Sequence, residues 1–440
     1  PEELVQVIGD YDGLMIRSGT QVTAEVIAAA SRLKIIGRAG VGVDNVDVPA
    51  ATQRGVLVVN SPEGNTIAAA EHALAMMLSI SRHVPQAHAG MRVGKWDRKK
   101  YVGNELYKKT LGVVGLGKIG SHVAKVARAM GMEVIAYDPF IAADRAQQMQ
   151  VRLTELAELF RSADYVTLHI PRTKDTENLV NAELLRTMKP SARIVNCARG
   201  GVVDEAAIAE AIDKGVIAGA GLDVFASEPL AEDSPLRAVE RGLVLTPHLG
   251  ASTEEAQENV AIDVAEQIRD VLLGLPARSA VNIPGLSAEI MERLKPHLQL
   301  AETVGGLLSQ LAGGQVQELE LRLQGEFASH PSQPLLIASL KGLLGAVLGD
   351  SINFVNASLE AKARGIRVVE VKDEASRDFT GGSLQLISRG DQGSRSVTGA
   401  VFADGELRIT SIDAFPVNVT PSSHMLFTRH RDMPGIIGKL

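Results

Sequence analysis

The stretch GVVGLGKIGSHVAKVARAMGMEVIAYDP, residues 112–139, decides the fold. Its apolar start predicts a buried strand, the helical spacing after Gly120 predicts an amphipathic helix, and the apolar run that ends at Asp138 predicts a second strand. Gly115, Gly117 and Gly120 have the G-x-G-x-x-G spacing, which allows a tight turn, the close approach of a pyrophosphate, and close packing of helix on strand. We therefore predict a Rossmann-type β-α-β unit that binds a dinucleotide.

Asp138 indicates which dinucleotide it is. It lies 138 − 120 = 18 residues after the last glycine, near the ~20 expected for a carboxylate that accepts both ribose hydroxyls. A 2′-phosphate would be repelled there, so the sequence predicts NAD in preference to NADP. The alternative is a tight turn without a cofactor, which the glycines alone would not exclude but the strand, helix and terminal acid disfavour.

Further short apolar runs predict strands on both sides of this unit. They are residues 13–18, 34–40, 56–60, 165–171, 193–199, 219–225 and 243–248, besides 110–117 and 133–139. Nearly all are continuous rather than alternating, which is typical of parallel strands buried on both faces. We therefore expect a doubly wound α/β architecture.

Two long helical patterns, residues 66–84 and 253–274, divide the chain. They predict a two-lobed body with a cleft, in which residues 66–253 form the nucleotide-binding domain and residues 1–65 with 254–285 form the other lobe. Residues 286–421 have Gly-rich loops and an alternating stretch, LELRLQGEF, and we expect them to form a third domain.

Composition limits the classes of protein. The 440 residues are 45% hydrophobic and 22% charged with a formal charge of −7, which is ordinary for a soluble globular protein and gives no reason to expect nucleic acid. Lys341 interrupts the most apolar run, so a membrane span is not expected. Cys197 is the one cysteine, which excludes a disulfide framework and indicates the reducing cytoplasm.

Four polar residues follow predicted strands, where such sheets bind ligands: Arg199, Asp223, Glu228 and His248. A guanidinium beside two glycines suits a substrate carboxylate. His248 could be a satisfied histidine at a strand end, but a carboxylate within reach, with Glu228 as the candidate, would fix its tautomer and favour general acid–base catalysis. Cys197 as a nucleophile is disfavoured, because no paired histidine is evident.

Several motifs resemble the D-isomer-specific 2-hydroxyacid dehydrogenases, namely NCARGGVVDE, DVFASEP and PHLGAST together with GLGKIG and YDP. GRAGVGVDNVD and GKWDRKKYVGNEL resemble the branch of that family that oxidises 3-phosphoglycerate to 3-phosphohydroxypyruvate at the entry to serine synthesis. The resemblance implies an NAD-binding domain inserted in a flavodoxin-like substrate domain, followed by an α+β regulatory domain. It also implies a homodimer or homotetramer, with no nucleic acid or membrane partner and no metal.

The resemblance assigns roles to residues. Arg199 would hold the substrate carboxylate and 2-oxygen, His248 would move the hydroxyl proton, and Glu228 would pair with His248. Cofactor contacts are implied at Val41, Gly115, Gly117, Lys118, Ile119, Gly120, Asp138, Ile170, Cys197, Ala198, Arg199, Asp223, His248, Leu249, Gly250 and Ala251. Relatives commonly carry threonine at two of these positions, Val41 and Ile170, so only backbone or packing contacts are expected there.

The resemblance also implies a cluster that binds the substrate phosphate. The candidates are Arg17, Ser18, Arg38, Asn65, Arg98 and Lys99, the last two reaching the site from a partner subunit. Solvated surface charges are the alternative, above all for the cluster WDRKK.

The ends of the chain carry two further expectations. The sequence begins at Pro1 without methionine, so we expect residues before it, and residues 422–440 resemble the start of an ACT domain, in which His430 and Asp432 would contact a serine effector. A chain that stops at Leu440 is expected to be insensitive to serine. Two other functions stay open: another D-2-hydroxyacid dehydrogenase, such as a glycerate or glyoxylate enzyme, or an NAD-sensing corepressor-like protein.

Overall fold

The computed structural model describes residues 2–283, 288–374, 382–403, 405–413 and 415–428, and the chain divides into two compact units. Unit 1 comprises residues 1–38, 42–60 and 264–440, and unit 2 comprises residues 39–41 and 61–263. The expected effector residues His430 and Asp432 lie outside the described residues.

Unit 2 is built around a seven-stranded parallel sheet in the order β10-β9-β8-β7-β4-β5-β6. The strands are β4 (Thr110–Val114), β5 (Glu133–Tyr137), β6 (Arg152–Leu153), β7 (Tyr165–Leu168), β8 (Arg193–Asn196), β9 (Gly219–Leu222) and β10 (Leu243–Leu245). Strand order reverses at β4, because β5 and β6 lie on one side of it and β7 lies on the other. Sheets of this kind bind nucleotides outside the carboxyl ends of the strands at such a reversal.

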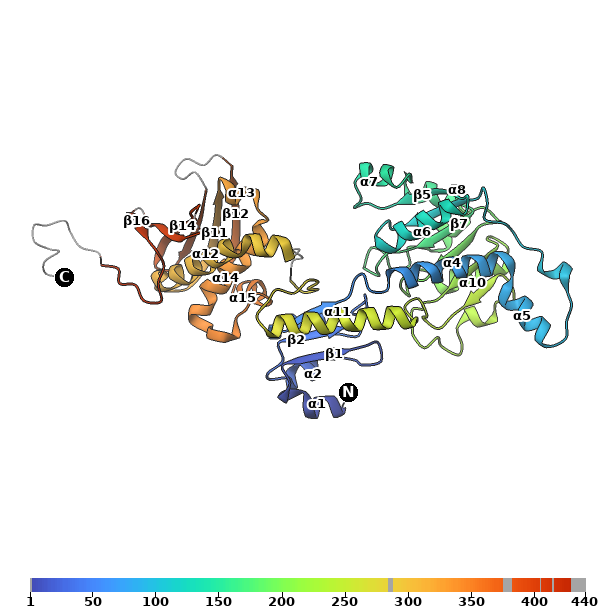
Figure 1. The fold of residues 1–440 in the computed structure, drawn as a ribbon, viewed down its shortest axis with the longest axis horizontal. Coiled ribbons are helices and arrows are strands. Elements are labelled where there is room, and N and C mark those ends of the chain that lie inside the picture. Colours follow the sequence, from blue (N-terminus) through green and yellow to red (C-terminus); the bar gives the residue numbers. More distant parts are fainter. Residues whose placement is uncertain (1, 284–287, 375–381, 404, 414, 429–440) are drawn as a thin grey trace, which may run out of the picture. The chain divides into compact units, whose positions relative to one another are not determined.

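Helices cover both faces of this sheet (Figure 1). Val113 and Val195 lie in one apolar core with α4 and α6, while their neighbours Val114 and Ile194 lie in a second core with α8 to α10. Successive strand residues point to opposite faces, so burial on both faces explains the continuous apolar runs. The helices are α4 (Thr66–Arg82), α5 (Val84–Arg92), α6 (Lys118–Ala129), α7 (Ala143–Gln148), α8 (Leu156–Ser162), α9 (Ala182–Arg186) and α10 (Glu205–Asp213), with the 3-10 helices η2 (Arg98–Tyr101) and η3 (Pro235–Ala238).

The first part of unit 1 has a three-stranded parallel sheet in the order β1-β2-β3. Its elements are α1 (Glu2–Val7), η1 (Ile8–Asp10), β1 (Gly13–Ile16), α2 (Ala24–Ala29), β2 (Ile35–Arg38), α3 (Val48–Arg54) and β3 (Leu57–Asn60). The side chain of Asp47 caps α3 by accepting from Ala50 N at 2.9 Å, and Gly55 ends the helix in the left-handed conformation.

The second part of unit 1 is α+β, as the sequence predicts. A six-stranded sheet in the order β12-β11-β13-β14-β15-β16 packs against α12 and α14 (Figure 1). Its elements are α12 (Ala288–Ala312), β11 (Val316–Gln324), α13 (Glu326–Ser329), α14 (Ser332–Leu348), η4 (Gly349–Ser351), α15 (Ala357–Ala363), β12 (Arg367–Asp373), β13 (Ser383–Gly390), β14 (Gly393–Val401), β15 (Leu407–Ile412) and β16 (Phe415–Val419).

One segment, Ser332–Ser351, is long and apolar enough to cross a membrane by length and composition alone. Its residues Leu335, Ala338 and Leu340 are buried in the core of the α+β part, and Lys341 Nζ pairs with Glu302 Oε1 at 2.6 Å. Packing of this helix inside the domain therefore accounts for its hydropathy.

The observed elements are shorter than predicted at their ends. β4 stops at Val114 instead of Gly117, because Gly115 takes a positive φ of 90° that ends the strand. The predicted helix 66–84 ends at Arg82, since His83 is left-handed, and the predicted helix 253–274 is α11 (Glu254–Leu272). β6, with two residues, was not predicted because so short a strand leaves no pattern.

Candidate functional site

The loop after β4 has the geometry of a pyrophosphate-binding turn. A Cβ on Gly115 would lie 2.5 Å from His169 O, and one on Gly120 would lie 2.0 Å from Gly115 O, so neither position accepts a side chain. A Cβ on Gly117, by contrast, would meet nothing within 4 Å. Gly117 caps α6, whose first backbone N–H groups have no partner within the helix. The lack of space at Gly115 and Gly120, and the open space at Gly117, therefore fit a turn that receives the pyrophosphate of a dinucleotide.

Asp138 follows β5 and accepts two backbone hydrogen bonds. Its Oδ2 accepts from Leu116 N at 2.8 Å, and its Oδ1 accepts from Phe140 N at 2.8 Å. The carboxylate thus holds the glycine loop in place while remaining half-buried. On the same loop, Lys118 Nζ pairs with Glu63 on the exposed surface, and this contact lowers the pKa of Glu63.

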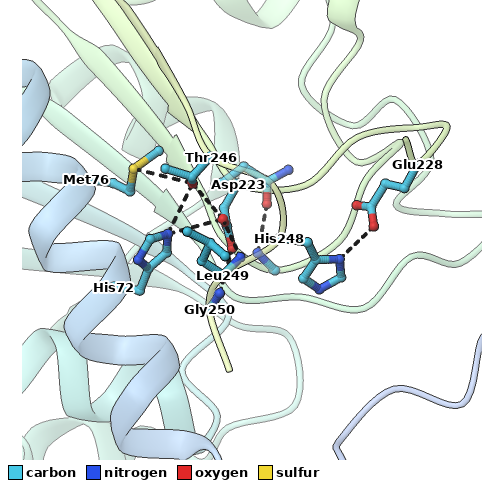
Figure 2. A network of polar contacts seen from close by, with 10 residues as sticks. His72, Met76, Asp223, Glu228, Thr246, His248, Leu249 and Gly250 are labelled. Atoms are coloured by element: carbon cyan, nitrogen blue, oxygen red, sulfur yellow. Dashed lines mark hydrogen bonds and ion pairs between the residues drawn. The ribbon is translucent and has the colours of Figure 1, made fainter. Parts of the chain in front are cut away.

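Asp223 is the centre of the polar network in Figure 2. It is fully buried after β9, and its carboxylate accepts from Leu249 N at 2.8 Å, from Gly250 N at 2.9 Å and from Thr246 Oγ1 at 2.6 Å. His72 Nε2, from α4, lies 3.1 Å from Asp223 Oδ1.

These contacts decide the ionisation of Asp223. Burial alone would raise the pKa of its carboxyl, but the hydrogen bonds from His72, Thr246 and Leu249 N outweigh burial and hold that pKa below its usual value. A buried carboxylate that stays charged at neutral pH organises the loop after β10 by accepting from its backbone.

His248 and Glu228 form a hydrogen bond, with Nδ1 2.7 Å from Oε2. Glu228 is itself held by Phe225 N, which donates to Oε1 at 3.0 Å. With Nδ1 donating to the carboxylate, Nε2 is the imidazole atom left to exchange a proton. An open pocket of about 490 Å³ adjoins the pair, and Figure 2 shows the histidine reaching toward Glu228 from the loop that Asp223 organises.

Arg199 and its neighbours follow β8. Arg199 Nη1 donates to Ala198 O at 2.7 Å, and Asn196 Nδ2 donates to Arg199 O at 2.9 Å. A Cβ on Gly200 would lie 1.7 Å from Phe225 O, which explains the glycine after Arg199. Burial and the Asp223 charge raise the pKa of the Cys197 thiol, which disfavours a nucleophilic role at neutral pH.

The remaining predicted residues are spread over both units. In unit 2, Asn65 precedes α4, and its buried Oδ1 has no hydrogen-bond partner among the described residues. Ile170 packs beside Gly115. Arg98 and Lys99 are exposed on η2. Val41 lies in unit 2 and is half-buried. Ile119, which lies on α6, and Ala251, which follows Gly250, are both half-buried. In unit 1, Arg17 and Ser18 are exposed after β1, and Arg38 is the last residue of β2.

Sequence reasoning missed His72. His72 lies on α4, whose apolar face packs on the sheet. It is four residues before Met76 on that face, and only this spacing could have indicated that His72 points toward the strand ends. His72, Cys197 and Asp223 are close enough to hold a metal ion. The protonated thiol and the fully engaged Asp223 carboxylate disfavour one there.

Comparisons with known proteins agree with this geometry. Residues 74–250 match the family model "D-isomer specific 2-hydroxyacid dehydrogenase, NAD binding domain", and residues 293–413 match "D-3-phosphoglycerate dehydrogenase intervening domain". A D-3-phosphoglycerate dehydrogenase of Synechocystis sp. is 61% identical over 100% of this chain and 79% of its own length, and one of Archaeoglobus fulgidus is 44% identical over 100% and 83%.

A solved structure has the same fold over the larger part of the chain. D-lactate dehydrogenase from Aquifex aeolicus, in complex with NAD and lactic acid, is 29% identical with a TM-score of 0.56, over 61% of this chain and 85% of that one.

Proposed function

The chain belongs to the D-3-phosphoglycerate dehydrogenases of the D-isomer-specific 2-hydroxyacid dehydrogenase family, and from that premise we propose which of its residues carry out the reaction. The reaction is the NAD-dependent oxidation of 3-phospho-D-glycerate to 3-phosphohydroxypyruvate, the first step of L-serine biosynthesis. The single observation that carries the residue assignment is the contact of His248 Nδ1 with Glu228 Oε2 at 2.7 Å.

His248 is the general base in this proposal. With Nδ1–H donated to Glu228, the lone pair on Nε2 accepts the proton of the substrate hydroxyl as the C–O bond becomes a carbonyl, and the same nitrogen returns the proton in reduction. Glu228 stabilises the imidazolium that forms. NAD, when bound, accepts the hydride from the substrate carbon.

Arg199 binds the substrate carboxylate and orients the 2-oxygen, because its fork of N–H donors matches a carboxylate. Gly115, Gly117 and the start of α6 hold the pyrophosphate, and Asp138 accepts the ribose hydroxyls. Asp223 acts by fixing the backbone of Leu249 and Gly250 near the cofactor. Val41, Lys118, Ile119, Ile170, Cys197, Ala198 and Ala251 complete the proposed cofactor contacts.

The finer assignments rest on family resemblance. They are the phosphate-binding residues Arg17, Ser18, Arg38, Asn65, Arg98 and Lys99, a homodimer or homotetramer, a serine effector, and a cytoplasmic location. A chain with a single cysteine, and so without an internal disulfide, supports this proposal of a reducing compartment. Sedimentation at several protein concentrations decides the oligomeric state.

The function is tested by following NADH absorbance with a panel of 2-oxo acids. Phosphohydroxypyruvate should give the highest kcat/KM, with glyoxylate, hydroxypyruvate and pyruvate at least about 100-fold lower, because a phosphate contact contributes only where the charge exists. A higher kcat/KM with glyoxylate or hydroxypyruvate would instead assign a glycerate-type dehydrogenase, and NADH binding without turnover would assign a sensor.

The phosphate residues are tested on the same panel. Arg17→Ala and Arg38→Ala should raise KM for phosphohydroxypyruvate about tenfold or more while changing KM for hydroxypyruvate little. Arg32→Ala is the matched control, since Arg32 is an exposed arginine of unit 1 that pairs with Asp12. Equal losses on both substrates would show that Arg17 and Arg38 are structural.

A further inference from the structure

Unit 1 brings two histidines and a glutamate together outside the dehydrogenase site. His297 lies on α12, Glu326 is the first residue of α13, and His330 follows that helix directly. One possible ligand atom of each lies within 4.8 Å of the other two. The two imidazole rings lie edge to face, with centroids 4.9 Å apart and planes at 75°.

Two nitrogens of this cluster are buried and unsatisfied. His330 is 7% exposed, and neither its Nε2 nor Nδ1 of His297 has a hydrogen-bond partner among the described residues. Glu326 Oε1 is 4.0 Å from His330 Nε2, which is too far for a hydrogen bond. Buried polar atoms without partners are rare in folded proteins, because they lose hydration and gain nothing in return. A bound group that accepts a lone pair from each of these two nitrogens would remove this cost.

A metal cation is such a group. Imidazole nitrogen and carboxylate oxygen are ligands of zinc at about 2.0–2.2 Å, which places ligand atoms about 3.4 Å apart in a tetrahedron. The ligand atoms of the cluster lie within 4.8 Å of one another, so binding would draw them closer together. Glu326 and His330 are four residues apart, which puts them on one side of a helical turn. Glu326 is exposed, so an ion can reach the cluster from solvent on the Glu326 side.

The charge environment keeps the histidines in the form that binds metal. Burial is the main cause that lowers the pKa of both imidazoles, and the Glu326 carboxylate only partly offsets it. His330 and Arg293 also lower the pKa of His297, and Arg293 and Lys372 also lower the pKa of His330, whose backbone O accepts from Lys372 Nζ at 3.1 Å. Neutral imidazole is the ligating form, so no proton has to be displaced at pH 7.

We propose that His297, Glu326 and His330 form a binding site for a divalent transition-metal ion of the zinc type, which ties α12 to the turn around α13. The neighbouring apolar ring of Phe327, whose centroid is 4.7 Å from that of His297, shields one side of the site. The site serves the intervening domain and takes no part in hydride transfer.

Metal binding to the purified, chelator-treated protein tests the proposal. Zinc is titrated into the wild type and into Cys197→Ser, which tests the separate cluster of His72, Cys197 and Asp223, and cobalt is titrated to record the visible absorption of a tetrahedral site. The wild type should bind one ion at this site. His297→Gln and His330→Gln should weaken binding at least about 100-fold and Glu326→Gln at least about tenfold, in line with losses of metal-site groups.

Controls separate this site from others. His424→Gln removes an exposed imidazole and should bind zinc as the wild type does. NADH affinity should be unchanged in all these variants. Zinc at about a hundredfold excess over Kd should raise the Tm by about 5 °C in the wild type and not in His330→Gln.

Other outcomes overturn the proposal. Equal zinc affinity in the wild type and in Glu326→Gln, whose exposed side chain leaves the core intact, would show that the cluster is not the site. So would zinc binding that is abolished by Cys197→Ser, or an absence of binding at micromolar zinc.

Discussion

His248 is held in a left-handed backbone conformation, with φ of 55°. Histidine enters this region more readily than most residues, and here His248 N donates to Asp223 O at 2.8 Å. The conformation turns the side chain out of the line of β10 and toward Glu228, so the position of the base depends on the backbone as much as on the hydrogen bond to Glu228.

His248→Gln should lower kcat by about 100-fold or more and leave the Kd for NADH within a factor of about three, because the proton acceptor is lost while the cofactor contacts remain. Asparagine also tolerates the left-handed backbone region, so His248→Asn should show the same loss of kcat and the same NADH affinity. Stopped-flow turnover and NADH fluorescence titration measure the two quantities. His424→Gln serves as the control, and near-normal turnover of His248→Gln would remove His248 from the mechanism.

Asp138→Ala should relax the preference for NAD over NADP by about tenfold or more in kcat/KM, since the repulsion of a 2′-phosphate disappears. Affinity for NAD should also fall, because Leu116 N loses its acceptor. Asp144→Ala removes an exposed carboxylate of α7 and should leave the ratio unchanged. Equal use of both cofactors by the wild type would contradict the role of Asp138.

At this scale, residues at strand ends could be predicted because glycine spacing and buried apolar runs fix where a parallel strand stops. The contact between Asp223 and His72 could not be predicted. His72 lies 151 residues earlier in the chain, 223 − 72, and its contact arises only when α4 packs against β9 and β10. No local pattern encodes a contact made across that separation.

The loop after β10 is the element on which the site depends. Thr246, Leu249 and Gly250 all donate to one carboxylate, so much of the polar anchoring of this loop passes through Asp223. The sequence predicted this loop as the bearer of His248, but the anchor became visible only with the fold.

Asp223→Asn should destabilise unit 2 by about 2–3 kcal/mol, because an amide nitrogen would face a backbone N–H in place of a charged acceptor. NADH affinity should fall at least about tenfold as the loop loosens. Guanidinium denaturation and NADH titration measure both. Asp213→Asn, an exposed carboxylate at the end of α10, should change stability by less than about 0.5 kcal/mol. A variant as stable as the wild type would show that the loop has another anchor.

Element types could be predicted well where burial was uniform. β7, β8 and β9 fall inside their predicted runs because both faces of the sheet are covered. Helix ends could be predicted less exactly: Pro85 indicates a break near residue 84, but the left-handed residue that ends α4 is His83, which is neither glycine nor proline.

Among the described residues, His169, His297 and His330 lower the stability of the fold in acid. Burial lowers the pKa of His169 to about 4, and burial also lowers the pKa of His297 and His330. At these three positions the unfolded chain takes up protons below about pH 6.5, whereas the folded chain does so only at lower pH. Stability should therefore be full above pH 6.5 and fall as the pH drops from about 6.5 toward 4.

The guanidinium midpoint, measured with chelator present, should fall by a few tenths of a molar, about 0.3 M or more, between pH 7 and pH 5.5. His169→Gln should reduce this dependence, because the residue that titrates in the unfolded chain is gone. His424→Gln, which is exposed, should retain it. A midpoint that rises in acid would contradict the assigned direction.

The raised pKa of the half-buried Cys197 offers a practical opportunity for spectroscopy. The chain has one cysteine, and its raised pKa leaves little thiolate for maleimide or iodoacetamide reagents. Cysteines introduced on exposed surfaces, such as Asp144 in unit 2 and Leu359 in unit 1, should be labelled selectively without first removing the native one. A fluorophore pair at such positions would report the distance between the two units in solution, with and without NADH.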